Sequence, residues 1–210
     1  MLLADPSDFA VASRFDGDDR FWGDRDPDAL LARRAPHLDS REGRLLLAGR
    51  NHVGLASEET SLLAYCSENP TIPTWSFWSL RVPDFERARL LCLWLNSTFA
   101  LSYLLDHRIT GTGAYIGWLK SDLAEMPSLD PSKVSGPERS LLLRVFDEIG
   151  SIEFPPLLRQ LRGRFEPRVR LDLAIADASK LLGYGTPAAL APLYDRCARK
   201  IEELANVHSK

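Results

Sequence analysis

The apolar run LLCLWLNSTFALSYLL at 90–105 constrains the fold more than any other part of the chain. With Pro83 and Asp84 as a start signal, the pattern predicts one helix of about six turns. Residues 90–95 are apolar on every side, so neighbouring elements must bury most faces of this helix. The run is shorter than the roughly 20 apolar residues of a membrane span and is interrupted by Asn96, Ser97, Thr98 and Ser102. We therefore expect a soluble, cytoplasmic protein with no membrane partner.

Composition separates an acidic N-terminal region from the rest of the chain. Residues 1–42 hold ten acidic and six basic side chains, a net charge of −4, whereas the whole chain carries only −3. Glycines and prolines interrupt this region, while Phe15, Phe21 and Trp22 offer apolar contacts. We expect an extension that is either disordered or docked on the body. Once this region is set aside, the charge balance neither demands nor excludes a nucleic-acid partner.

The remaining chain predicts a sheet region followed by helices. Residues 43–131 are expected to form an α/β region. Its strands are expected at 44–51, 61–67, 75–82 and 113–120. A loop is expected over 67–74, and Ser121 is expected to cap a helical turn. Residues 132–210 form a helical region, with a proline near the start of each helix, at 137–150, 155–163, 167–182 and 187–206. The expected fold is α+β: a small mixed sheet region with a long buried helix, followed by a helical C-terminal part.

The sequence holds no arrangement of residues typical of an enzyme. The four histidines are isolated, and no Cys-x-x-Cys or His-x-x-x-His spacing occurs, so we expect no metal site. The turn TGTGAY at 110–115 follows a helix and precedes a strand, the reverse of the order in a phosphate-binding loop. We expect no cofactor and no catalytic residue. Cys66, Cys92 and Cys197 are odd in number and far apart, which indicates reduced thiols.

Two groups of residues have side chains suited to binding. The first combines cations, hydroxyls and aromatic rings that suit phosphates and bases: Arg108, Thr110, Thr112, Tyr115, Trp118 and Lys120. The alternative is that Tyr115, Ile116 and Trp118 are core residues of a strand and that Lys120 is merely exposed. The second group is a basic surface expected on the helical tail: Arg159, Arg162, Arg164, Arg168 and Arg170. It is either a solvated face or a surface for a partner.

The sequence of 87–130, RARLLCLWLNSTFALSYLLDHRITGTGAYIGWLKSDLAEMPSLD, resembles the C-terminal target-recognition region of adenine-specific DNA methyltransferases that use S-adenosylmethionine, including restriction-modification and phage-defence enzymes. In that family a Leu-Asn-Ser-Thr turn, here 95–98, precedes a Gly-aromatic strand, here 113–120. A segment with Asp122, Leu123, Met126 and Pro127 follows. With the flanking segments the resemblance covers about residues 43–206.

The family's catalytic elements are missing from the chain. It has no glycine-rich loop for S-adenosylmethionine, and its single Asn-Pro, Asn69-Pro70, is followed by Thr71 instead of the proline and aromatic residue that hold a flipped adenine. The resemblance implies a non-catalytic module that recognises double-stranded DNA, with Arg50, Asn51 and Arg108 as donors to base edges. A separate methyltransferase or defence-complex subunit is then a possible partner. The alternative is a protein–protein interaction subunit of such a complex with no direct DNA contact.

Overall fold

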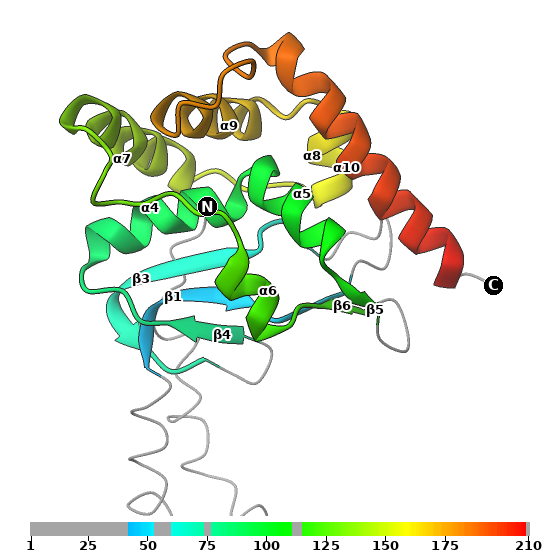
Figure 1. The fold of residues 1–210 in the computed structure, drawn as a ribbon, viewed down its shortest axis with the longest axis horizontal. Coiled ribbons are helices and arrows are strands. Elements are labelled where there is room, and N and C mark those ends of the chain that lie inside the picture. The colour runs from blue at the N-terminus through cyan, green and yellow to red at the C-terminus, as the bar shows by residue number, and fades with distance from the viewer. Residues whose placement is uncertain (1–41, 53–59, 74–76, 111–114, 209–210) are drawn as a thin grey trace, which may run out of the picture.

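The computed structural model describes residues 42–52, 60–73, 77–110 and 115–208, and it confirms the α+β class. Two three-stranded sheets lie on one side of the molecule, and a layer of helices lies on the other (Figure 1). All described strand pairs are antiparallel. The buried helical segment predicted near residue 90 lies between the sheets and the outer helices.

The larger sheet, sheet A, has the strand order β3-β1-β4. Its strands are β1 (Gly43–Ala48), β3 (Ala64–Thr71) and β4 (Phe77–Leu80). Leu45, Leu46 and Leu47 in the centre of β1 are all at most 2% exposed, which explains its continuous apolar run. The predicted loop over 67–74 is wrong in its first half, because β3 continues to Thr71. This strand accommodates Pro70 because it lies at an edge, where one side of the backbone needs no ladder partner.

The smaller sheet, sheet B, has the order β2-β6-β5, with β2 (Arg50–His52), β5 (Ile109–Thr110) and β6 (Tyr115–Gly117). Gly49 joins β1 to β2 where the chain passes from sheet A to sheet B. A Cβ atom at Gly49 would lie 2.1 Å from Nε1 of Trp78, so only glycine allows the indole to lie against this backbone. The predicted strand at 44–51 is therefore two strands in two different sheets.

The predicted six-turn helix is two helices, α4 (Phe85–Asn96) and α5 (Thr98–Asp106), bent by 61°. Asp84 caps α4 as expected, since its carboxylate accepts a 2.8 Å hydrogen bond from Arg87 N. Ser97 is extended and serves both helices. Its hydroxyl donates to Trp94 O at 2.7 Å and accepts from Ala100 N at 3.2 Å. The break occurs because this hydroxyl satisfies backbone groups that a continuous helix would pair within itself.

The C-terminal part is helical, as predicted. Its helices are α7 (Gly136–Gly150), α8 (Leu157–Arg162), α9 (Glu166–Ala178) and α10 (Pro187–His208), and the short helix α6 (Lys120–Glu125) precedes them. Helix α7 packs against α4 and α9, and α10 packs against α5 and α8 (Figure 1). Ser121 does not cap α6, because the helix already begins at Lys120 and Ser121 lies in its first turn. The start of α6 is stabilised instead by Leu119 N, which donates a hydrogen bond to the Asp122 carboxylate at 3.2 Å.

One cluster of buried side chains joins the sheet region and the helical region. It includes Leu45 and Leu47 of β1, Leu90 and Leu93 of α4, and residues of every helix from α7 to α10. Leu129 and Val134, which lie between α6 and α7, also belong to it. Helices α4 and α5 are thus enclosed on several faces, as their all-round apolar sequence requires.

Candidate nucleic-acid interface and a buried polar network

Sheet B brings together predicted binding residues that lie about sixty positions apart in the sequence. In its register Arg50 lies opposite Gly117, Asn51 opposite Ile116, and Thr110 opposite Ile116 from the other side. Tyr115 lies opposite His52 at the start of β6, and Lys120 is the first residue of α6. Thr112 lies outside the described residues. The backbone therefore places five of the eight predicted residues on one small sheet and the helix that follows it.

Two of the predicted contact residues have structural roles. Trp118 is 5% exposed, and its indole nitrogen donates to Leu104 O of α5 at 2.8 Å. The hypothesis that Trp118 stacks on a base is wrong, and the alternative of a core residue is confirmed for it. Arg108 is partly buried and donates from Nη1 to Leu105 O, so its cation lies at the negative end of α5. The Trp118 bond, with Tyr103 Oη donating to Asp122 O at 3.1 Å, holds the segment after β6 against α5.

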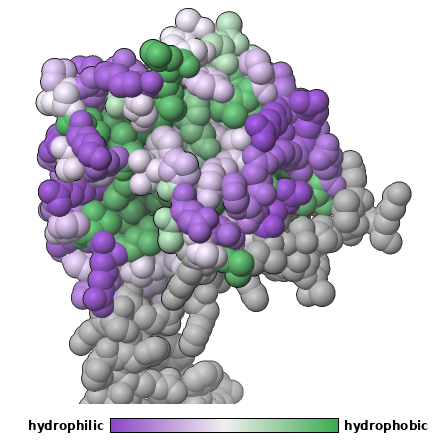
Figure 2. All heavy atoms as spheres, viewed as in Figure 1, coloured by the Kyte–Doolittle hydropathy of each residue, from purple (hydrophilic) through white to green (hydrophobic). Residues whose placement is uncertain are grey.

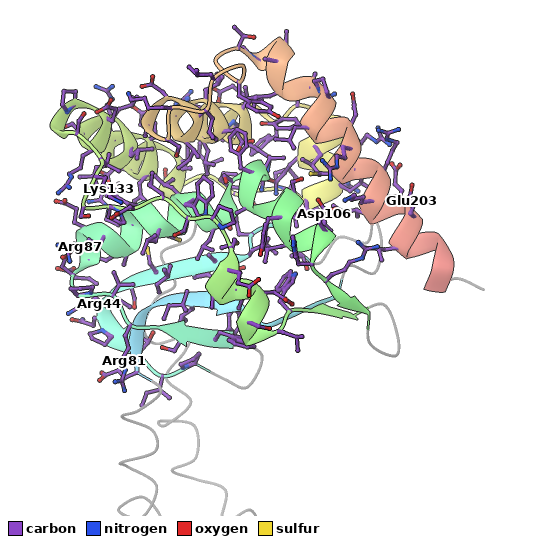
Figure 3. All side chains as sticks on the ribbon, viewed as in Figure 1. Arg44, Arg81, Arg87, Asp106, Lys133 and Glu203 are labelled. Atoms are coloured by element: carbon purple, nitrogen blue, oxygen red, sulfur yellow. The ribbon has the colours of Figure 1, made fainter. Side chains whose placement is uncertain are left out.

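Cations gather where α5 ends and β5 begins. Asp106, the last residue of α5, accepts from Arg196 Nη2 at 2.7 Å and pairs with Lys200, both on α10 (Figure 3). Arg108 follows two residues later. These four residues together carry three positive charges and one negative charge at pH 7. Figure 2 shows hydrophilic side chains over the part of the surface occupied by α10.

The arginines of the helical tail do not form a basic surface. Arg162 is paired with Glu202 at 2.5 Å, Arg164 with Asp195 at 2.8 Å, and Arg170 with Glu166 at 2.6 Å. Arg159 is exposed. Arg168 is 1% exposed, so its placement on a surface is wrong. The cluster looks basic in sequence because its acidic partners come from distant parts of α7 and α10 or from the preceding turn.

Arg168 lies instead in a buried polar network that sequence reasoning missed. Its Nε donates to Gln160 Oε1 at 2.5 Å, and its Nη1 donates to Asn96 O at 3.0 Å and to Thr98 Oγ1 at 3.2 Å. Thr98 in turn donates from N and from Oγ1 to the two carboxylate oxygens of Asp172, at 2.7 Å and 2.6 Å. Tyr194 Oη donates to the same carboxylate at 2.6 Å. Helices α4, α5, α8, α9 and α10 are thereby joined around two opposite buried charges that the Thr98 hydroxyl connects.

Burial disfavours both charges of this network. It lowers the pKa of the Arg168 guanidinium and raises the pKa of the Asp172 carboxyl, which Arg168 and the bonds from Thr98 and Tyr194 pull back down. The spacing Arg168-x-x-x-Asp172 within one helix is the one sequence signal that could have indicated this contact. Such spacing is common on solvated helices, so the signal alone does not distinguish a buried pair from an exposed one.

Asn96 anchors α4 to the sheet side. Its Oδ1 accepts from Leu63 N at 2.8 Å and from Ala64 N at 3.1 Å, and its Nδ2 donates to Ala64 O at 2.7 Å and Cys92 O at 3.1 Å. The side-chain amide thus pairs backbone groups at the start of β3. Leu-Asn-Ser-Thr, the motif that carries the family resemblance, is fully buried in this chain and acts as a junction of the core.

The three cysteines are buried free thiols, as expected from the sequence. Burial raises the pKa of Cys92 and raises the pKa of Cys197 to about 11, so neither thiol is activated as a nucleophile. Among the described residues no group of three or more histidine, cysteine or acidic side chains could hold a metal ion. Within the same residues no single helix could cross a membrane; only α4 and α5 together have the required length and composition, and they are bent.

No family model, curated protein or solved structure matches this chain. The resemblance to the recognition region of adenine-specific DNA methyltransferases remains a prediction from the motifs in the sequence.

Proposed function

We propose that this chain is a non-catalytic module that binds double-stranded DNA through sheet B and its flanking residues. The observation that carries the proposal is the register of β2, β6 and β5, which assembles Arg50 and Asn51 with Thr110 and Tyr115. Arginine and asparagine are the residues that most often form paired hydrogen bonds to guanine and adenine edges, while hydroxyls position phosphates. The motif resemblance in 87–130 supports the same class of partner.

The charge distribution agrees with this location. Arg196 and Lys200 pair with Asp106 next to β5, and Arg108 follows two residues later, so these four residues carry a net positive charge that favours phosphates. A DNA duplex would therefore approach the sheet B end, with α10 alongside.

The test is binding of the full chain to a fluorescent random duplex at about 50 mM and about 200 mM salt, where several phosphate contacts predict at least a tenfold loss of affinity. Lys120→Ala should weaken binding to every sequence and reduce the salt slope by about one, whereas Arg50→Ala with Asn51→Ala should also relax base preference. Arg144→Ala is the matched control, because Arg144 is an exposed arginine of α7 with a side chain 67% accessible. Absence of binding at low salt, or equal effects of the Lys120 and Arg144 variants, would refute the proposal.

A second candidate function is docking of a protein partner within a larger complex. It is favoured by Leu182, whose side chain is 94% exposed in the turn between α9 and α10, and by Leu119, which is 52% exposed before α6. An interface built on such residues would be largely insensitive to salt. Two results together would favour this function. The chain would bind no DNA, and it would form a complex with a protein partner that persists at high salt but does not form with the Leu182→Asp variant.

A further inference from the structure

Two of the three cysteines lie in the contact between sheet A and α4. Cys66 of β3 and Cys92 of α4 are 2% and 0% exposed and belong to the same buried cluster. In β3, Cys66 shares a face with Ala64, because side chains two residues apart point to the same side of a strand. In α4, Cys92 lies one turn before Asn96 and therefore on the same face of the helix.

The Asn96 amide fixes how these two faces meet. It accepts from Ala64 N at 3.1 Å and donates to Ala64 O at 2.7 Å, so the two residues are in direct contact. Helix α4 packs on β3 and runs in the opposite direction (Figure 1). One helical turn covers about 5 Å and two strand residues cover about 7 Å, so a turn back from Asn96 and two residues forward from Ala64 lead to adjacent positions. Cys92 and Cys66 occupy these positions and share a side-chain hydrogen bond.

Contact with a second thiol, and not activation, distinguishes this pair of cysteines. Burial raises the pKa of Cys92, and the Cys66 thiol raises it further, so the Cys92 thiolate is scarce at neutral pH. Asn96 Nδ2 donates to Cys92 Sγ at 3.7 Å. Cys197 is equally buried on α10, but its thiol forms a hydrogen bond with Ser102 of α5. Cys197 therefore serves as a buried thiol in a different environment.

We propose that Cys66 and Cys92 are a modification site at which a small peroxide forms a disulfide between β3 and α4. The peroxide first oxidises one thiol: its O–O bond breaks, one oxygen joins the sulfur as a sulfenic acid, and the other leaves as water. The neighbouring thiol then attacks the sulfenic sulfur, the S–S bond forms, and the remaining oxygen leaves as water. The two sulfurs are oxidised and the peroxide is reduced to water. This site does not depend on the proposed DNA binding.

Burial selects the oxidant, and the contact between the thiols selects the product. Hydrogen peroxide is close to water in size, so it reaches the sulfurs through small local openings of the fold. The second step needs no diffusion, because the other thiol is already held beside the oxidised sulfur. A disulfide joins its sulfur atoms at about 2 Å, so the two side chains need only approach along the direction of their existing contact. The product is a covalent bond between sheet A and the helix that covers it.

Peptide mapping of the folded full chain after treatment with hydrogen peroxide tests the proposal. Once the peroxide is removed, the chain is alkylated in urea without reductant and digested, and cross-linked peptides are identified by mass. We expect one cross-link, between Cys66 and Cys92, with the loss of two hydrogens, while Cys197 is recovered as the alkylated thiol. A sample unfolded in urea before the treatment should give a mixture of pairings that includes Cys197, because the fold no longer selects one.

Variants separate the pair from the third cysteine. Cys197→Ser is the matched control and should form the cross-link at the wild-type rate, whereas Cys66→Ser and Cys92→Ser should form none. Far-UV circular dichroism before and after treatment verifies that the chain stays folded. Absence of the Cys66–Cys92 cross-link in the folded wild-type chain would overturn the proposal. Equal amounts of cross-links to Cys197 in that sample would also overturn it, since unfolding and not the fold would then bring the thiols together.

Discussion

The buried charges of Arg168 and Asp172, connected through the Thr98 hydroxyl, give the sharpest prediction about stability. Replacing Arg168 by methionine keeps a long apolar side chain but removes the donors to Gln160, Asn96 O and Thr98. It also leaves the Asp172 carboxylate buried without a cation. Removing one partner of a buried pair typically costs about 3–5 kcal/mol. This is a large part of the roughly 5–15 kcal/mol that stabilises an ordinary domain.

The cost of Arg168→Met should also depend on pH. Arg168 lowers the pKa of Asp172, so the carboxyl pKa in the folded variant rises further above its ordinary value of 3.8. The folded chain then keeps a proton that the unfolded chain releases, and stability falls as pH rises through this interval. We therefore expect the difference between wild type and variant to be smaller near pH 4 than at pH 7.

Urea unfolding followed by far-UV circular dichroism measures this difference at each pH. Arg170→Met is the matched control, because Arg170 lies two residues along the same helix but is 43% exposed and paired with Glu166 at the surface. It should change stability by at most about 1 kcal/mol. Combining Arg168→Met with Asp172→Asn should cost less than the two single changes added together. An Arg168→Met protein within about 1 kcal/mol of wild type at both pH values would falsify the role assigned to this pair.

Three further predictions concern separate parts of the fold. Gly49→Ala should destabilise the chain by about 1–3 kcal/mol in urea unfolding, because its Cβ would collide with Trp78; an unchanged unfolding midpoint would contradict this. Cys197, with a pKa raised to about 11, should resist iodoacetamide at pH 8 until urea unfolds the chain, and rapid labelling of the native protein would disprove its burial. Lys180 lowers the pKa of Glu138, so the stability difference between wild type and Glu138→Gln should be present at pH 7 and vanish as pH falls through that lowered pKa. A difference that stays constant with pH would rule out this contribution.

Local sequence patterns predict most helices and strands of the fold. The predictions for Ser97 and Arg168 are wrong because long-range contacts decide the structure at these positions. The helices after residue 135 were predicted from prolines and apolar spacing, which are local properties. The pattern does not predict the break at Ser97. The Ser97 hydroxyl that caps both helices is local, but the bonds that join Thr98 to α9 and Asn96 to β3 form only in the folded chain. The same long-range contacts converted Arg168 from an expected surface residue into a buried one.

The candidate interface shows a similar division. Residue types in 108–120 indicated a binding segment, and the register of sheet B then joined Arg50 and Asn51 to it. The ring of Trp118 suits stacking on a base, but its bond to Leu104 O shows that the indole faces the interior. A side chain's chemistry can be read from the sequence, whereas its accessibility depends on which backbone groups happen to lie near it.

The sequence by itself determined the α+β class, the need to bury residues 90–105, and the cap at Asp84, because propensity, periodicity and capping act within a few residues. Only the tertiary structure decided that Asn96, Thr98, Arg168 and Asp172 form one network, that the tail arginines are neutralised by acids from other turns and helices, and that β2 pairs with β6. These outcomes depend on contacts between distant segments. Their energies come from desolvation and hydrogen-bond geometry, which exist only once the chain is packed.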